Sequence, residues 1–307
     1  MNFQTKEGVF IFVKNRSAII KLSVSMAIFG SIGFFTIHTG IPALELVFIR
    51  CICATIILTS IWCLIGQHKK ETFTKKNVMS TIVCGVFLVL NWVFLFKAFE
   101  VMSISIAITL YNLAPIFLLI ISFVFLRERL NLLGVIATAL CFLGSILIIG
   151  LDHLQSVESL KSSGFIWSIL SAVCYALTML TSKRIEQLSS YALTFIQTTV
   201  GILMLIPFCD FSVFQSLTTS NWLYIIGTGV IHTGFVYYLF FDSVRTLPTF
   251  LVSVFVFIDP LVAILLDVVI LSFIPSTFQI IGMGLIFGGI LGTVLLPNRR
   301  NIHKSTT

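Results

Sequence analysis

Ten apolar segments, each about 20 residues long, follow one another along the whole chain. A helix of about 20 apolar residues is long enough to cross the hydrocarbon core of a bilayer. The loops between the segments are short and polar, and none is long enough to form a soluble domain. The sequence therefore predicts an all-α membrane protein whose ten transmembrane helices lie at 17–38, 43–66, 78–97, 102–126, 132–150, 163–182, 191–209, 221–240, 248–270 and 276–296.

The composition requires a lipid environment. Of the 307 residues, 58% are hydrophobic and only 10% are charged, whereas soluble domains carry about 25% charged residues. The seven cysteines show neither a CxxC pair nor the Cys/His spacing of a metal site. The sequence also lacks a P-loop for nucleotide phosphates. We therefore expect the bilayer as solvent, with no metal and no cofactor.

The basic residues predict how the chain is oriented. If the N-terminus is cytoplasmic, sixteen of the nineteen Lys and Arg residues lie on the cytoplasmic side and two lie outside, while Arg50 falls within a span. This asymmetry follows the positive-inside rule. We expect a protein of the cytoplasmic membrane with both termini inside, namely an uncleaved N-terminal segment at 1–16 and a basic tail at 297–307. Topology explains the net charge of +7, so no nucleic-acid partner is expected.

The chain contains an internal repeat. A shift of 145 residues aligns NLAPIFLLIISFVFL with FIDPLVAILLDVVIL, so that Pro115 falls on Pro260, and it also pairs Gly144 with Gly289. Each half has five spans, and an odd number inverts the second half in the membrane. We expect two five-helix repeats at 17–150 and 163–296. Inverted repeats of this kind are typical of transporters that alternate access around a midplane site.

The two five-span copies, the proline in each fourth span, the RER at 127–129 and the glycine-containing fifth spans resemble EamA-like transporters of the drug/metabolite transporter superfamily. The resemblance implies a secondary transporter for a small organic metabolite, such as an amino acid, a nucleobase-like compound, a cofactor or a drug. It also implies that spans one to four of each half line a central cavity, with the fifth spans peripheral. Glu128, the acid after the fourth span, has Phe273 as its counterpart, which confines any role of that acid to one half.

An aspartate and a proline lie together in the middle of the ninth span. An ionisable group inside a membrane indicates function by default, and a proline frees backbone carbonyls that can face a cavity. We interpret Asp259 as a site for a substrate amine or a proton, while a cap within a distorted turn is the structural alternative. Pro115 and Pro260 are expected to kink their helices. Asp267 is expected at the lip of the membrane rather than at the site.

Two further ionisable residues lie in apolar spans. His232 could carry a proton and pair with Asp259, or it could only hydrogen-bond a neighbouring helix. Arg50 cannot be neutralised and needs a carbonyl, a carboxylate or an anionic ligand. The sequence leaves open whether Arg50 anchors the fold or contacts substrate, and the spacing to Glu45 argues against a local ion pair.

Polar and aromatic side chains of the third, fourth and eighth spans complete the expected cavity: Asn91, Trp92, Tyr111, Asn112 and Tyr237. Trp92 and Tyr237 are repeat counterparts at the offset of 145. Two facing aromatic rings would suit a planar or amphipathic solute. The alternative is that aromatic residues, at 13% of the chain, mostly face lipid or neighbouring helices.

The tenth span contains two overlapping GxxxG steps at Gly284, Gly288 and Gly292. Such steps allow two helices to approach closely. Packing within the monomer and a homodimer seam are the two interpretations of this pattern.

Two other classes of function are weaker. A membrane-embedded enzyme would rely on Ser31 in the GSIG stretch together with His38 and His232, but the sequence places no acid or base beside the serine. A channel would need a repeated filter or a ring of charges, which one Asp, one His and one Arg do not provide. A transporter that takes a small-molecule substrate remains the leading prediction.

Overall fold

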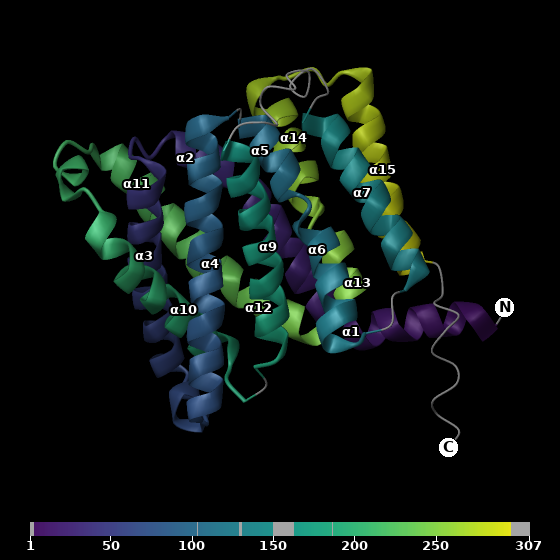
Figure 1. Ribbon diagram of the computed structural model, residues 1–307, viewed down its shortest axis with the longest axis horizontal. Helices are drawn as coiled ribbons and strands as arrows, with labels where there is room; N and C mark the ends of the chain where they lie inside the picture. Colours follow the sequence, from purple (N-terminus) through teal and green to yellow (C-terminus); the bar gives the residue numbers. More distant parts are fainter. Residues whose placement is uncertain (1–2, 103, 129–130, 150–162, 186, 296–307) are drawn as a thin grey trace.

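A computed structural model describes residues 3–102, 104–128, 131–149, 163–185 and 187–295, and the basic tail expected at 297–307 lies outside them. Within the described residues every regular element is a helix, and ten stretches are long and apolar enough to cross a membrane (Figure 1). The expected all-α fold with ten spans is confirmed.

The helices divide into two halves. The first half contains α1 (Phe3–Gly30), α2 (Ile32–Ile37), α3 (Ala43–Leu64), α4 (Lys75–Val101), α5 (Ile104–Tyr111), α6 (Ala114–Ile121) and α7 (Leu132–Ile149). The second contains α9 (Ser163–Lys183), α10 (Ser190–Leu205), α11 (Thr219–Gly227), α12 (Val236–Thr246), α13 (Thr249–Phe255), α14 (Ile258–Leu271) and α15 (Thr277–Leu295). Short 3-10 segments are η1 (Gln67–Lys70), η4 (Ile206–Phe208) and η5 (Phe211–Phe214), and π-helical segments are η2 (Ser122–Leu126) and η6 (Thr228–Phe235).

Several helices differ from the expected spans at their ends and in their interiors. The third span begins earlier than expected because the Thr74 hydroxyl accepts a hydrogen bond of 3.2 Å from the Asn77 amide and so caps α4. The first span is divided at Ser31, between α1 and α2. The eighth span runs through α11, η6 and α12, and its π-helical middle has no signal in the apolar pattern. Polar caps and helix defects are set by local hydrogen bonds, which hydropathy does not report.

The two halves interlock. The α1 helix of the first half packs against α12 and α14 of the second, and α9 packs in the equivalent way against α4 and α6. The α3 and α10 helices pair with each other, and so do α7 and α15, which lie side by side at one edge of the bundle (Figure 1). The centre of the bundle is therefore built from both halves.

The fifth spans of the two halves contact each other through small residues. A Cβ added to Gly144 would lie 2.6 Å from the carbonyl oxygen of Gly282, and one added to Gly289 would lie 2.5 Å from Cys141 Sγ. The first contact has a counterpart under the 145-residue shift, because Gly144 maps to Gly289 and Gly282 maps to Ala137, whose carbonyl oxygen lies 3.1 Å from a Cβ added to Gly289. The α7–α15 pair follows the symmetry that the sequence repeat predicts.

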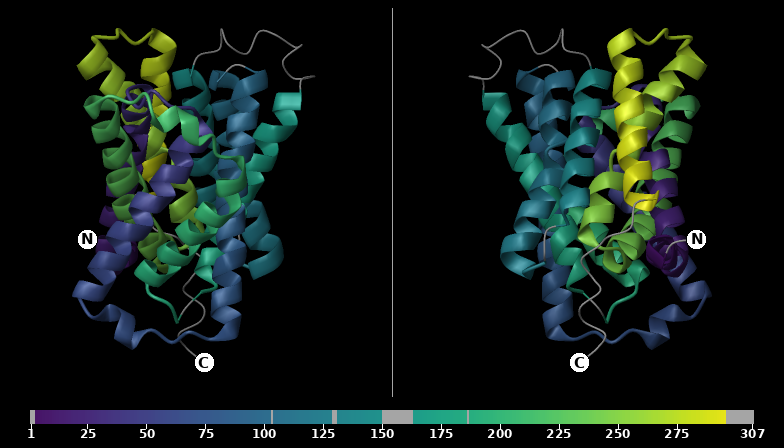
Figure 2. Two further views of the ribbon diagram at one scale, coloured as in Figure 1. Left: turned by 90° about the vertical axis from the view of Figure 1, so that its left-hand side faces the viewer. Right: turned by 90° about the vertical axis from the view of Figure 1, so that its right-hand side faces the viewer.

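The loops lie at two opposite ends of the bundle. Figure 2 shows the segment that joins α3 to α4 at the lower end and the turn between α14 and α15 at the upper end. The first turns of α1 lie across the bundle rather than along it (Figure 1). Large apolar side chains such as Leu203 and Val269 remain exposed on the spans, as expected where helices face lipid tails.

Candidate functional site

The fourth span of each half is interrupted just before its proline. The α5 helix ends at Tyr111 and α6 begins at Ala114, while α13 ends at Phe255 and α14 begins at Ile258. Proline removes a backbone donor and fits only the first turn of a helix. The two breaks are equivalent under the 145-residue shift, so both belong to the repeated scaffold.

Asp259 lies in the first turn of α14, directly after the second break. The N-terminus of a helix carries a partial positive charge that favours a carboxylate. The described residues provide no hydrogen-bond donor and no cation to the Asp259 carboxylate, so the structural alternative of a side-chain cap is wrong. The phenol groups of Tyr111, Tyr175 and Tyr237 lie within electrostatic range of the carboxylate.

Aromatic rings from both halves gather beside Asp259. Tyr111 stacks on Tyr175 with ring centroids 5.4 Å apart and an interplanar angle of 13°, and Tyr175 in turn stacks on Phe240 at 6.1 Å. Phe29 of α1 meets Tyr237 edge to face at 5.1 Å. Tyr175, Phe240 and Phe29 had no signal in the sequence, because each is one of many apolar or aromatic residues in its span.

Trp92 and Tyr237 contact each other. Their ring centroids are 5.8 Å apart at an interplanar angle of 80°, and the indole nitrogen interacts with the tyrosine hydroxyl. Both side chains are buried, at 8% and 5% exposure. The two repeat counterparts do face one another, but in this structure no planar solute fits between them.

Arg50 is buried on α3 and faces the eighth span. The helices approach closely there because a Cβ on Gly229 would lie 2.5 Å from Cys53 Cβ and 3.3 Å from Arg50 Cα. The guanidinium Nε donates a hydrogen bond of 2.8 Å to the Thr233 hydroxyl, and the guanidinium carbon lies 6.0 Å from the centre of the Trp92 ring. Glu45 instead accepts a hydrogen bond from the backbone of Asp210, so the local pair with Arg50 is absent, as expected.

His232 does not pair with Asp259, and that hypothesis was wrong. Its Nε2 lies 2.9 Å from the Ser31 hydroxyl, and its ring lies 4.8 Å from that of Phe35. The Nδ1 atom is buried without a partner among the described residues. The π-helical turn of η6 directs His232 toward the break between α1 and α2, which a plain helical projection does not predict.

The two asparagines differ in their positions. Asn91 is buried, accepts a hydrogen bond of 3.0 Å from the Ser171 hydroxyl, and interacts through its amide with Tyr111. It therefore joins α4 to α9 beside the aromatic cluster. Asn112 lies in the break of the fourth span and donates to Ser145 of α7 at 3.5 Å. The structure thus turns Asn112 toward the fifth span.

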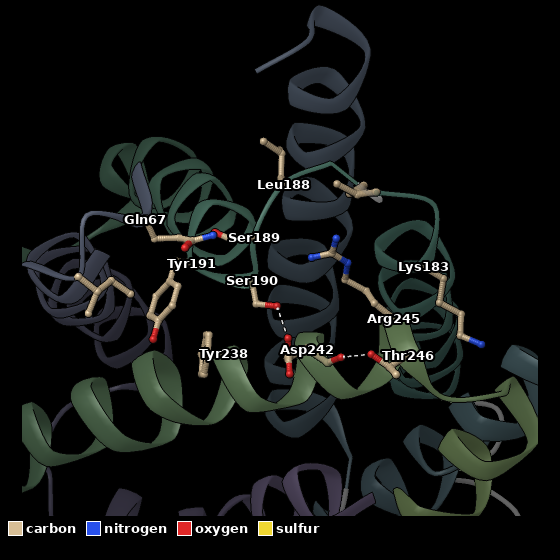
Figure 3. A pocket seen from close by; sticks show the side chains of 12 residues that line it. Gln67, Lys183, Leu188, Ser189, Ser190, Tyr191, Tyr238, Asp242, Arg245 and Thr246 are labelled. Atoms are coloured by element: carbon tan, nitrogen blue, oxygen red, sulfur yellow. Dashed lines mark hydrogen bonds between the residues drawn. The ribbon is translucent and has the colours of Figure 1, made fainter. Parts of the chain in front are cut away.

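A cavity lies toward each end of this central region. The upper cavity, of about 490 Å³, is bounded by the upper ends of α3, α4 and α10 and reaches Trp92; its charged residues are Glu45, Lys97 and Glu100. The lower cavity, of about 680 Å³, lies between the lower ends of α9, α10 and α12 (Figure 3). There Asp242 accepts from Ser190 at 3.3 Å and from Lys21 of α1 at 2.6 Å.

Among the described residues, nothing packs closely against the three glycines of the GxxxG steps. A Cβ added to Gly284, Gly288 or Gly292 would meet nothing within 4 Å, so the interpretation of intramolecular packing was wrong for these positions. The neighbouring face of α15, with Gly282 and Gly289, makes the close contact to α7 instead. The 100° rotation per residue places the two sets of glycines on different faces of one helix.

Known proteins resemble this chain along most of its length. The profile of the EamA-like transporter family matches twice, at residues 16–150 and 162–295. The "Uncharacterized transporter YxxF" of Bacillus subtilis (strain 168) is 49% identical over 91% of this chain and 90% of its own length. The "Uncharacterized transporter YetK" of the same strain is 25% identical over 98% of this chain.

A solved crystal structure shares the fold. It superposes with a TM-score of 0.77 over 92% of this chain and 99% of that chain, at 20% sequence identity. The family profile and the relative that is 49% identical lead to the same assignment. This chain belongs to the EamA-like transporter family and is a multi-pass membrane transporter.

Proposed function

We propose that this protein is a secondary transporter that moves a small organic metabolite across the cytoplasmic membrane by alternating access. The transported solute would bind near the membrane midplane, between the upper and lower cavities. The distribution of basic residues supports a cytoplasmic lower end of the bundle, so that the upper cavity would face outward. Both termini would then be cytoplasmic.

One observation carries this proposal. The counterpart residues Trp92 and Tyr237 meet between two cavities that open at opposite ends of the bundle. Inverted repeats give a protein two conformations of similar energy, because each half can adopt the arrangement of the other. If the two rings move apart at one end of the bundle, the central residues become exposed to that side of the membrane and stay closed to the other.

Within this mechanism Asp259 is the residue that binds a substrate amine or a proton. Its carboxylate has no protein partner among the described residues and lies beside three phenols. Asn91, Tyr111 and Tyr237 would orient the solute, and Pro115 and Pro260 would shape the two breaks. Asn112 has a supporting role through α7.

The test is solute uptake into proteoliposomes that contain the purified protein. A thermal-shift screen of amino acids, nucleobases and cofactors would first supply a labelled solute. Asp259→Asn is expected to reduce the initial rate at least about tenfold, the size of effect expected when a hydrogen bond to a charged group is lost. Asp267→Asn is the matched control on the same helix, because Asp267 is exposed, and it should transport normally.

Normal transport by Asp259→Asn over the whole pH range would exclude Asp259 from the mechanism. Uptake that rises in proportion to solute concentration without saturation would contradict a transporter with a binding site and favour a pore.

A further inference from the structure

Arg50 is a buried cation without a matching anion. Its side chain is 6% exposed and is one of the buried side chains of α3. Among the described residues no carboxylate forms an ion pair with it; the ion pairs there join Asp242 to Lys21 and Glu128 to Lys183. A buried guanidinium stays charged at any accessible pH. The membrane interior therefore holds a positive charge that the described protein does not neutralise.

Most of the hydrogen-bonding capacity of this guanidinium remains unused. An arginine has five N–H donors in a planar fork, and only Nε donates to a described residue, Thr233. Buried polar atoms without a partner do occur here, for example His232 Nδ1, but the terminal nitrogens of Arg50 are not among those fully enclosed atoms. These nitrogens therefore have no acceptor among the described residues. Two parallel N–H groups at the end of an arginine match the two oxygens of a carboxylate or another oxyanion.

The surroundings of Arg50 fit a ligand rather than a structural anchor. Trp92 lies against the guanidinium and also lines the upper cavity, so the cation lies directly behind the wall of a space of about 490 Å³. Thr233 bonds Nε and so holds the plane of the fork in one orientation. An arginine that served only to join α3 to the eighth span would direct its terminal nitrogens at backbone carbonyls or carboxylates of that span, and the described residues show no such bond.

We propose that Arg50 binds an oxyanion group of the transported solute, such as a carboxylate, with Thr233 as a positioning residue and Trp92 as the adjoining apolar wall. This inference rests on the proposed transport function and specifies in addition that the transported solute carries a negative charge. The bound anion neutralises Arg50 in the interior, so the site favours solutes with a negative group over their neutral analogues. Tyr237 interacts electrostatically with both Arg50 and Asp259, and Asp259 stays available for its own partner.

The first test needs no variant. Phenylglyoxal modifies accessible guanidinium groups, and peptide mapping by mass spectrometry reports the modification of Arg50 separately from that of other arginines. Benzoate should protect Arg50 in the purified protein, whereas benzamide, which has the same shape without the charge, should not. Equal modification of Arg50 with benzoate and benzamide, or no modification of Arg50 at all, would overturn the proposal.

The second test compares variants in benzoate binding by calorimetry. Arg50→Lys keeps the charge but loses the fork, and we expect benzoate to bind about 10- to 100-fold more weakly. Thr233→Val keeps the guanidinium but removes the acceptor of its Nε hydrogen bond. This variant should weaken benzoate binding less than Arg50→Lys does. Lys97→Gln removes the cation at the rim of the upper cavity and should bind benzoate as the unchanged protein does. Loss of binding in Lys97→Gln but not in Arg50→Lys would place the anion at the rim and overturn the assignment.

The outcome separates this inference from the proposed function. If proteoliposomes take up a neutral or cationic solute with saturation, and Arg50→Lys leaves that uptake unchanged, the transporter stands and the anion subsite fails. If no solute is transported but benzoate protects Arg50, the anion subsite stands and transport fails.

Discussion

Trp92 and Tyr237 occupy equivalent positions in the two inverted halves, and their rings meet edge to face 5.8 Å apart at the centre of the bundle. Each ring belongs to the third span of its half, and each is buried. Arg50 lies against Trp92, and Asp259 lies within electrostatic range of Tyr237. The aromatic contact therefore connects the surroundings of buried Arg50 with those of partly buried Asp259.

We predict that Trp92 and Tyr237 are energetically coupled. Aromatic pairs in this geometry contribute about 0.5–1.5 kcal/mol beyond their buried area. In a double-mutant cycle of Trp92→Phe and Tyr237→Leu, measured by unfolding in detergent, the double variant should differ from the sum of the single variants by about that amount. Trp222→Phe, whose ring stacks on Phe214 instead, serves as the control and should be additive with Tyr237→Leu. Additivity at both positions would show that the contact carries no energy.

We predict that α1 tolerates no side chain at Gly30. A Cβ there would lie 2.6 Å from the backbone oxygen of Asp259, so Gly30→Ala must push α1 away from the first turn of α14. Overpacking of this kind costs about 1–3 kcal/mol, more than the gain of about 1 kcal/mol in helix propensity. Gly33→Ala, where nothing lies within 4 Å, should leave thermal unfolding in detergent unchanged or slightly improved. Equal stability of the two variants would contradict the close approach.

We predict that the two glycine faces of α15 respond differently to substitution. Gly282→Ala brings a Cβ to 2.5 Å from the carbonyl oxygen of Gly144 and should lower the unfolding temperature. Gly284→Ala meets nothing within 4 Å and should be neutral or stabilising. Loss of stability in Gly284→Ala alone would mean that this face is covered.

The homodimer interpretation of the GxxxG steps concerns the outward face of α15. If two copies pack through Gly284, Gly288 and Gly292, then Gly288→Leu should dissociate them, because a large side chain prevents close helix approach. Mass measurement in nanodiscs before and after the substitution decides this. An unchanged mass would assign the face to lipid.

We predict that the ion pair between Lys21 and Asp242, at the lower end of the bundle, affects the rate of transport. Their side chains are 2.6 Å apart and about a third exposed, at 35% and 37%, so the pair contributes only about 0–1 kcal/mol to stability. Lys21→Glu and Asp242→Lys should each slow transport because each places like charges between α1 and α12, while the double exchange should recover part of the rate. If the double variant is as slow as the slower single variant, the ion pair does not determine the transport rate.

A counterpart of this pair lies at the upper end. Asp242 maps to Lys97 under the 145-residue shift, and the Lys97 ammonium lies 5.9 Å from the Trp167 ring. Trp167 maps to Leu22, the neighbour of Lys21. The equivalent helix pairs are therefore joined by an ion pair at one end and by a cation–aromatic contact at the other, so substitutions at the two ends need not have equal effects.

The ten spans, the inverted repeat and the repeated prolines Pro115 and Pro260 can be recognised from the sequence alone. These features depend on local composition and on a constant offset, which the linear chain records directly. It also identified Arg50 and Asp259, because a charge inside an apolar span is visible without any fold.

Which of these residues contact one another depends on how the helices pack. The π-helical turn of η6 directs His232 to Ser31 rather than to Asp259, and the break at Asn112 directs that side chain to Ser145. Tyr175 joins the site because α9 packs across the repeat boundary. Contacts of this kind depend on helix rotation and on helix pairing between distant segments, and a pattern of apolar residues specifies neither.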